Sequence, residues 1–199
     1  MPRLLLPLIL ASGSPRRADI LRQAGIPFEV VLPKTAEDSQ EEGGRPWLGA
    51  KRNALRKARS VSRDRPGRIV VGADTMVVCG SEVLGKPGTR KEAVAMLEKL
   101  SGRDHIVITG IALSRWEDGQ AEEETSYERT VVSFKQLGKS EIHAYVASGE
   151  PLDKAGGYGI QGKGACLVQG IRGCYFNVVG LPLYRLCDML KRWDYDIPW

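Results

Sequence analysis

A run of small residues followed by two arginines is the segment of this chain best suited to bind an anion. Residues Ala11 to Arg17 read ASGSPRR, after an apolar run from Leu4 to Leu10 and before a helix-like segment from Ala18 to Ala24. A strand, a turn and a helix start in this order present unpaired backbone N–H groups at the positive end of a helix dipole. The guanidinium groups of the two arginines add paired N–H donors that match two phosphate oxygens. The segment therefore predicts a phosphate-binding turn.

The same N-terminal residues also fit a short secretory signal with a cleavage site at Ala11-Ser12-Gly13. We favour the phosphate-binding turn, because cleavage there would remove the preceding strand and leave two arginines just past the cut. No other stretch approaches the roughly 18 apolar residues that a membrane span needs. The four cysteines form no CxxC pair and lie near no histidine at zinc spacing. This cysteine pattern favours a reduced, cytoplasmic protein.

Asp74 is the acid best placed for catalysis. It follows the apolar residues Ile69 to Val71 in the sequence IVVGADT, a pattern that predicts a carboxylate at the end of a buried strand. Ligands bind at that position in α/β sheets. An aspartate that caps a turn gives the same local pattern, so a catalytic role for Asp74 depends on its partners.

Two lysines and a polar loop supply such partners. Lys57 borders the apolar stripe of a helix expected to begin at Pro46, and Lys86 lies between a glycine and a proline. With Arg16 and Arg17, these lysines would neutralise a triphosphate, whose hydrolysis depends mainly on charge stabilisation and positioning. Asp74 would then handle water or a divalent metal, with Glu37 or Asp38 as a second acid.

A glycine-rich block runs from Asp153 to Ala165 and holds five glycines in thirteen residues. Glycines allow close backbone approach to a nucleotide, although many glycine-rich loops only make turns. The block matches neither a Walker loop nor a GxGxxG turn. Within it, the Gln161 amide can both donate and accept, which suits the edge of a base, and it can equally bond to the backbone.

The chain as a whole predicts one α/β unit. It has 199 residues, 42% of them hydrophobic, and a formal charge of +5, with no linker, repeat or low-complexity tract. Apolar β-branched runs alternate with helix-like segments. Thr89 and Glu92 stand at capping-box spacing, and a last helix is expected from Leu183 to Arg192. The expected strands are Ile26–Leu32, Ile69–Val71, Met76–Val78, His105–Leu113 and Thr130–Phe134, with hairpin turns at 79–81 and 117–119 and an acidic, solvated hairpin over 118–126.

Taken together, the motifs of this chain resemble the Maf family of nucleoside triphosphate pyrophosphatases. The resemblance runs from Leu10 to about Leu186, and several motifs in fixed order are far more specific than any one of them. The motifs are ASGSPRR at Ala11–Arg17, GADT at Gly72–Thr75, GKP at Gly85–Pro87, LSG at Leu100–Gly102, EPLDKAG at Glu150–Gly156 and YGIQG at Tyr158–Gly162.

The resemblance implies a single domain over residues 1–199, with an elongated mixed sheet, flanking helices and two lobes around a cleft, similar to the inosine triphosphatases. It implies hydrolysis of a nucleoside triphosphate to the monophosphate and pyrophosphate, with Asp74 as proton acceptor and Mg²⁺ or Mn²⁺ as cofactor. The implied phosphate and metal region is lined by Ser12, Arg17, Glu37, Lys57 and Lys86. The leader from Met1 to Leu4 is expected to extend the first strand.

Three positions divide the family into subgroups, and here they are Arg16, Thr75 and Gln161. This combination resembles the subgroup that acts on dTTP and UTP, with CTP or modified pyrimidines as further substrates. The 7-methyl-GTP subgroup has a tryptophan, a glutamine and a glutamate at these places. A neutral amide at Gln161 suits the mixed donor and acceptor edge of a pyrimidine.

The main alternative from another class is a regulatory protein that binds a nucleotide or nucleic acid without turnover, since the family is linked to arrest of septum formation. Nucleic acid would use the basic run from Lys51 to Arg68, but no aromatic residues stand in that run to stack bases. We therefore expect an enzyme with no membrane or nucleic-acid partner. The resemblance also allows a homodimer.

Overall fold

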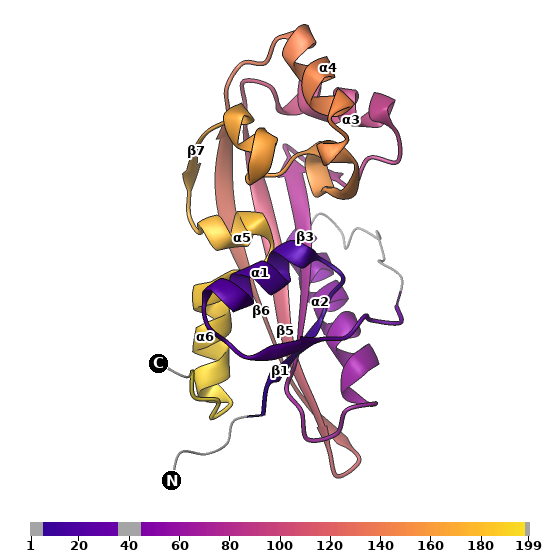
Figure 1. The fold of residues 1–199 in the computed structure, drawn as a ribbon, viewed down its shortest axis with the longest axis vertical. Helices are drawn as coiled ribbons and strands as arrows, with labels where there is room; N and C mark the ends of the chain where they lie inside the picture. The colour runs from indigo at the N-terminus through magenta and orange to yellow at the C-terminus, as the bar shows by residue number, and fades with distance from the viewer. Residues whose placement is uncertain (1–5, 36–44, 198–199) are drawn as a thin grey trace.

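A seven-stranded mixed sheet runs the length of the molecule (Figure 1). The computed structural model describes residues 6–35 and 45–197. β1 pairs in parallel with β2 and β3, whereas the remaining neighbours pair antiparallel in the order β3-β5-β6-β7, and β4 pairs with β3. The elongated mixed α/β sheet is thereby confirmed. The strands are β1 (Leu8–Ala11), β2 (Phe28–Val30), β3 (Val70–Cys79), β4 (Glu82–Leu84), β5 (Asp104–Glu117), β6 (Gln120–Phe134) and β7 (Val168–Arg172).

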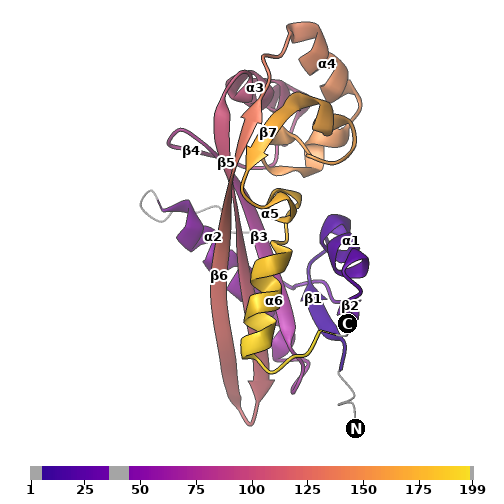
Figure 2. The ribbon, with the colours of Figure 1, turned by 90° about the vertical axis from the view of Figure 1, so that its left-hand side faces the viewer.

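Helices cover both faces of the long strands. Figure 2 shows α2 on one side of β3, β5 and β6, with α5 and α6 on the other. The α-helices are α1 (Pro15–Gln23), α2 (Pro46–Ser62), α3 (Arg90–Leu100), α4 (Lys139–Ala147), α5 (Tyr175–Val179) and α6 (Leu183–Arg192). Three 3-10 helices, η1 (Glu150–Asp153), η2 (Ala155–Gly157) and η3 (Gly162–Leu167), follow α4.

Two of the four apolar clusters among the described residues define two lobes along this shared sheet. The first core packs α1 and α6 against β1 and includes Leu10, Leu21 and Met189. The second packs α3 and α4 against the opposite ends of the long strands and includes Leu97 and Phe134. β3 contributes Val71 and Ala73 to the first core and Val77 to the second. The expected two-lobe arrangement therefore holds, with both lobes built on the same strands. That all 199 residues form a single domain remains a prediction.

Several local signals appear where the sequence places them. Pro46 begins α2, Thr89 caps α3 by accepting from the Glu92 backbone N–H at 3.2 Å, and α6 has the expected bounds. At the β5–β6 turn, Asp118 and Gly119 have φ of 50° and 78°, as a two-residue hairpin requires. The acidic segment after it belongs to β6, which confirms a hairpin.

Several expected boundaries are wrong. The expected strands Ile69–Val71 and Met76–Val78 form the single strand β3. The expected strand Thr130–Phe134 is the end of the longer β6, and Ile26–Leu32 shortens to β2. The first strand begins at Leu8 rather than Leu4, and the proline before it has no N–H to donate to a sheet ladder. The expected extension from Met1 to Leu4 lies outside the described residues. The first helix begins at Pro15 rather than Ala18, because proline is preset for the first helical position. Both arginines therefore lie in the first turn of α1. Within the described ranges, no helix has the length and apolar character to cross a membrane.

Candidate active site

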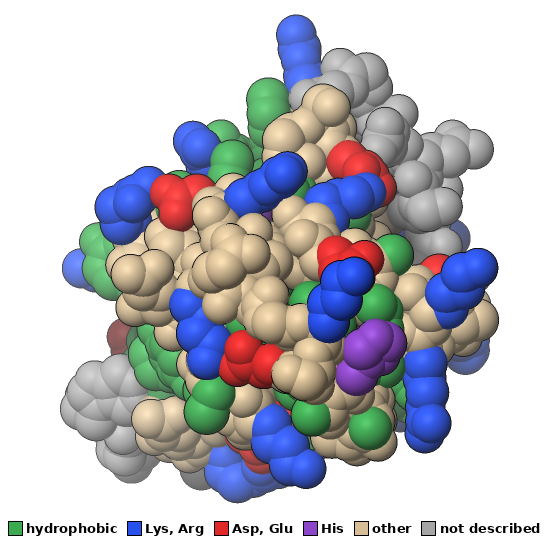
Figure 3. All heavy atoms as spheres, turned by 90° about the horizontal axis from the view of Figure 1, so that it is seen from above, with side chains coloured by type: hydrophobic (Ala, Val, Ile, Leu, Met, Phe, Trp, Pro, Cys, Tyr) green, Lys and Arg blue, Asp and Glu red, His purple; other side chains and the backbone are tan. Residues whose placement is uncertain are grey.

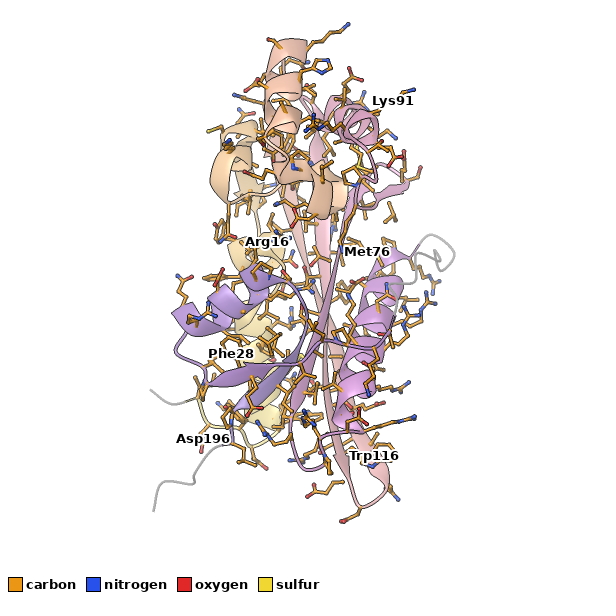
Figure 4. The ribbon with its side chains drawn as sticks, turned by 45° about the vertical axis from the view of Figure 1, so that its right-hand side comes forward. Arg16, Phe28, Met76, Lys91, Trp116 and Asp196 are labelled. Carbon is orange, nitrogen blue, oxygen red and sulfur yellow. The ribbon has the colours of Figure 1, made fainter. Side chains whose placement is uncertain are left out.

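All the predicted site residues that the structure describes line one cavity of about 650 Å³ between the two lobes. Its walls come from the start of α1, one face of α2, the middle of β3, the loop after β4 and the segment from η1 to Gln161. Figure 4 places Arg16 and Met76, which both line the cavity, at mid-height between Lys91 and Trp116 at the two ends. The predicted residues that line it are Ser12, Arg16, Arg17, Lys57, Asp74, Thr75, Lys86 and Gln161.

Asp74 is held by two side chains of α2. Its Oδ1 accepts from Lys57 Nζ at 2.7 Å, and its Oδ2 accepts from Asn53 Nδ2 at 3.0 Å. The Lys57 and Asp74 side chains are 6% and 9% exposed. Asn53 and Lys57 are four residues apart, so they project from the same face of the helix. Each carboxylate oxygen keeps a second lone pair for another donor, such as water.

Two glycines allow α2 to lie this close to the sheet. A Cβ on Gly72 would fall 2.1 Å from the Ala54 carbonyl oxygen, and one on Gly110 would fall 2.3 Å from the Ala50 carbonyl carbon. Gly110 is the residue that pairs with Asp74 across β3 and β5. Any side chain at these positions would push the helix outward. The glycines thus set the reach of Asn53 and Lys57 to the carboxylate.

The expectation that Asp74 ends a strand is wrong. β3 is continuous through Asp74, because its pairing with β5 runs unbroken from Val70 to Val78. On the opposite edge of β3, the pairing with β1 stops earlier, because its last pair joins Ala11 to Gly72. Asp74 therefore lies just beyond the carboxyl end of β1, and the turn that follows β1 opens beside it.

Arg17 is fixed by three neighbours. Its guanidinium donates to Ser12 Oγ at 3.0 Å, to Thr75 Oγ1 at 3.1 Å and to the Gly180 carbonyl at 2.8 Å. Thr75 Oγ1 also lies 3.0 Å from Thr109 Oγ1. Arg17 is buried, so its charge is fixed at the wall of the cavity. Two predicted residues, Ser12 and Thr75, thus contact the cavity's buried arginine.

Arg16 reaches across the cavity to the other lobe. Its Nη1 donates to Asp153 Oδ2 at 3.2 Å. Lys154 Nζ donates to the other oxygen of the same carboxylate at 2.6 Å. In the lobe that carries Asp153, a hydrogen bond of 3.0 Å from the Gly156 N–H to the Gly85 carbonyl joins η2 to the loop that carries Lys86. Arg16 therefore lies beside the segment that carries Gln161.

One pair of predicted acids cannot be placed. Glu37 and Asp38 lie outside the described residues. In ranges 6–35 and 45–197, no three His, Cys, Asp or Glu side chains gather to hold a metal ion. A site with a single carboxylate still suits Mg²⁺, which takes one or two carboxylates together with water and substrate phosphates. Asp74 fits that requirement.

The sequence reasoning missed two residues of the site. Asn53 binds the catalytic candidate, and its position one helical turn before Lys57 was the available signal. Asp153 belongs to the EPLDKAG motif, but no local pattern indicates that its partner is Arg16, 137 positions away. Both residues join the site only through long-range contacts.

Comparison of the chain with known proteins shows which family it belongs to. A family model described as "Maf-like protein" matches residues 7–193. The chain belongs to the Maf family. The resemblance inferred from the motifs is thereby confirmed over nearly the whole chain.

Relatives of this Maf family member cover it almost end to end. A protein of Symbiobacterium thermophilum named dTTP/UTP pyrophosphatase is 53% identical over 96% of this chain and 95% of its own length. A protein of the same name from Dictyoglomus thermophilum is 45% identical over 96% of this chain and 97% of its own. Among solved structures, the Staphylococcus aureus Ham1 protein aligns with a TM-score of 0.43 and 11% identity, covering 65% of this chain and 72% of that one.

Proposed function

We propose that this chain is a nucleoside triphosphate pyrophosphatase that hydrolyses dTTP and UTP to the monophosphate and pyrophosphate. The observation that carries the proposal is the buried Asp74–Lys57 pair, which lines the same cavity as two arginines and an amide. The two relatives described above, both named dTTP/UTP pyrophosphatase, support the same activity.

The cations of the cavity would bind the triphosphate. Arg17 and Lys57 lie on the wall near Asp74, Lys86 lies on the facing loop, and the start of α1 has no acidic residue in its first turn. Fixed positive charge and unpaired N–H groups at a helix N-terminus stabilise phosphate oxygens without reorganisation. We assign Ser12 to the same region through its contact with Arg17.

Asp74 would act as general base. A water that bonds to a free lone pair of its carboxylate gives up a proton to it and attacks the α-phosphorus, and the bond to the bridging oxygen of pyrophosphate breaks. Lys57 and Asn53 hold the carboxylate in one orientation for that transfer. Positioned acids and bases of this kind contribute typically about 10²–10⁴-fold to a rate.

We propose Mg²⁺ or Mn²⁺ as the cofactor, with Asp74 as a carboxylate ligand and Glu37 as the proposed second acid. When bound, such an ion supplies charge neutralisation for the phosphate oxygens. The oxygen ligands that this chain offers at Asp74 match the preference of these hard cations.

The base would be selected by Arg16, Thr75 and Gln161. Gln161 and Arg16 line the cavity from opposite lobes, so a base between them meets an amide and a cation. Thr75 would act through Arg17, to which its hydroxyl is bonded. The amide of Gln161 matches the uracil and thymine edge, where acceptor and donor alternate.

The test is product analysis with purified protein and Mg²⁺ or Mn²⁺ over dTTP, UTP, CTP and 7-methyl-GTP. We expect monophosphate and pyrophosphate in equal amounts from dTTP and UTP. Orthophosphate with a diphosphate would refute the proposed bond cleavage, and binding of dTTP without any product would favour the regulatory alternative. The Asp74→Asn variant is the control for a contaminating hydrolase.

A nucleic-acid partner is not favoured by the charge arrangement. On α2, Arg59 donates through two nitrogens to Glu123 of β6, at 2.6 and 2.5 Å. At the α3–α4 end, Lys and Arg side chains are spread among Asp and Glu rather than gathered in one patch (Figure 3).

All four cysteines are described and are free thiols, in keeping with the proposed cytoplasmic location. A homodimer remains a prediction.

A further inference from the structure

The backbone on both sides of Gln161 is fixed by one carboxylate and the tyrosine hydroxyl bonded to it. Glu150 Oε1 accepts from the Gly164 N–H at 3.1 Å, and Oε2 accepts from the Lys163 N–H at 3.1 Å. Tyr145 OH donates to Glu150 Oε1 at 3.0 Å and accepts from the Gly159 N–H at 3.2 Å. The hydrogen bonds therefore bracket Gln161, from two residues before it to two and three residues after it.

The glycines of this segment are explained by the same two side chains. Gly162 has a φ of +68°, and a Cβ there would lie 3.0 Å from Glu150 Oε2. A Cβ on Gly164 would lie 2.7 Å from Tyr145 OH and 2.2 Å from the Gly159 carbonyl. The chain around Gln161 is thus wrapped closely over the carboxylate and the hydroxyl.

The two groups suit fixed roles as acceptor and donor. Partial burial raises the pKa of the Glu150 carboxyl. The hydrogen bonds from the Gly164 and Lys163 N–H groups and from the Tyr145 hydroxyl lower it by more, so the pKa lies below its ordinary value. Burial raises the pKa of the Tyr145 hydroxyl. At neutral pH Glu150 is therefore an anion that only accepts, and Tyr145 is a neutral donor.

The side chain of Gln161 depends on this backbone. Gln161 stands at the N-cap of η3, its side chain makes no capping hydrogen bond, and it lines the cavity. Within the described part of the chain, no capping hydrogen bond holds the amide in one direction. Its direction is set by the path of the chain from Gly159 to Gly164.

We propose that Glu150, assisted by Tyr145, is the positioning residue for base selection: its carboxylate holds the Lys163 and Gly164 N–H groups, and the hydroxyl bonded to it holds the Gly159 N–H, so that the Gln161 amide faces the base. The proposal rests on the proposed function, because it assigns Gln161 to the base. It places no part of the chemical step on Glu150, which acts at the loop and not at Asp74.

The test is Glu150→Gln, in which the new amide turns an NH₂ group toward one of the two backbone N–H donors. We expect KM for dTTP to rise and the preference for dTTP over dATP in kcat/KM to fall by about tenfold, the change that follows from roughly 1.4 kcal/mol of lost interaction. The kcat for dTTP should change far less, since Asp74 and Lys57 are untouched. Tyr145→Phe should shift both values in the same direction by less.

The matched control is Glu141→Gln, which removes a carboxylate of α4 that pairs with the surface residue Lys135. It should leave KM and base preference at wild-type values. Amide hydrogen exchange over residues 158–165 gives a readout that does not need turnover, and it should be faster in Glu150→Gln and unchanged in the control.

Two results would overturn the proposal. Exchange and base preference could both stay at wild-type values in Glu150→Gln, or kcat/KM could fall equally for dTTP and dATP together with the melting temperature, as for a structural residue. If the wild-type protein releases no pyrophosphate, the proposed function fails separately. The hydrogen-exchange comparison still decides whether Glu150 fixes the loop.

Discussion

Lys57 Nζ lies 2.7 Å from Asp74 Oδ1, and each side chain is at least nine-tenths buried. A buried pair of this kind costs much desolvation, and hydrophobic residues of similar size often stabilise a protein as well or better. Stability alone therefore does not explain the pair. Its position on the wall of a cavity that Arg16, Arg17 and Gln161 also line is the basis of the catalytic role that we propose for it.

Asp74→Asn should lower pyrophosphate release from dTTP by about 10²-fold or more, because it removes the base and keeps the shape of the side chain. Nucleotide affinity should be retained, since the cations of the cavity remain. Steady-state kinetics and equilibrium binding check the two parts. A fully active variant would show that another group accepts the proton.

Lys57→Ala should lower the free energy of unfolding by about 3–5 kcal/mol, because it leaves the buried Asp74 carboxylate without its cation. Lys34→Ala is the control, since it breaks a pair with Asp64 in which both side chains are exposed. That variant should unfold at nearly the wild-type urea concentration. The double variant Lys57→Met with Asp74→Leu should regain most of the lost stability and remain inactive. Equal losses in the two single variants would contradict the assignment of a buried pair.

Gly110→Ala should reduce both stability and turnover. Its Cβ would meet the Ala50 backbone, and overpacking of this kind costs typically about 1–3 kcal/mol. The displaced α2 would carry Asn53 and Lys57 away from Asp74, so kcat should fall more than KM changes. Gly170→Ala in β7 is the control, because a Cβ there meets nothing within 4 Å. Wild-type kcat in Gly110→Ala would show that α2 has other room to move.

Gln161→Glu should weaken the use of dTTP and UTP relative to purine triphosphates, because a carboxylate can accept from a base but cannot donate to one. Gln169→Glu makes the same charge change on an exposed residue of β7 and should leave the ranking intact. The measurement is kcat/KM over a nucleotide panel. An unchanged ranking in Gln161→Glu would leave this glutamine as a structural residue.

His105 should make the protein less stable as the pH falls. Burial lowers its pKa to about 4, so the folded state keeps the imidazole neutral and the unfolded state takes up a proton below about 6.5. Stability from this group is complete above that value and is lost between about pH 6.5 and 4, by up to about 3 kcal/mol. Urea unfolding at pH 7.5 and pH 4.5 should show the advantage of wild type over His105→Gln shrinking at the lower pH. The same advantage at both values would mean that His105 is not held neutral.

Much of the site is visible in the sequence because its signals are local. Pro46 presets the first turn of α2, and Thr89 caps α3 with its own hydroxyl. Such contacts lie within a few residues, so composition and spacing are enough to locate them. The arginine, lysine and glutamine candidates also come from local patterns, namely the ASGSPRR, GKP and YGIQG motifs and, for Lys57, the border of the apolar stripe of α2.

The remainder depends on pairing between distant segments. Asp74 lies inside β3 rather than at its end because β5, more than thirty residues later, pairs with it across Gly110. Asn53 matters because Asp74, 21 residues on, accepts its hydrogen bond. Local patterns carry no information on which distant segments pair or touch. The pairing of β3 with β5 and the hydrogen bond from Asn53 to Asp74 therefore could not be derived from them.

The long strands have a consequence for how a nucleotide enters. β3 carries Asp74 and Thr75 beside one lobe and Val77 in the core of the other, and its ladder with β5 is continuous from Val70 to Val78. Rotating one lobe against the other would break hydrogen bonds of that ladder. The separation between the two described walls is therefore set by strand geometry, and a nucleotide bound as proposed would meet a cavity of preset width.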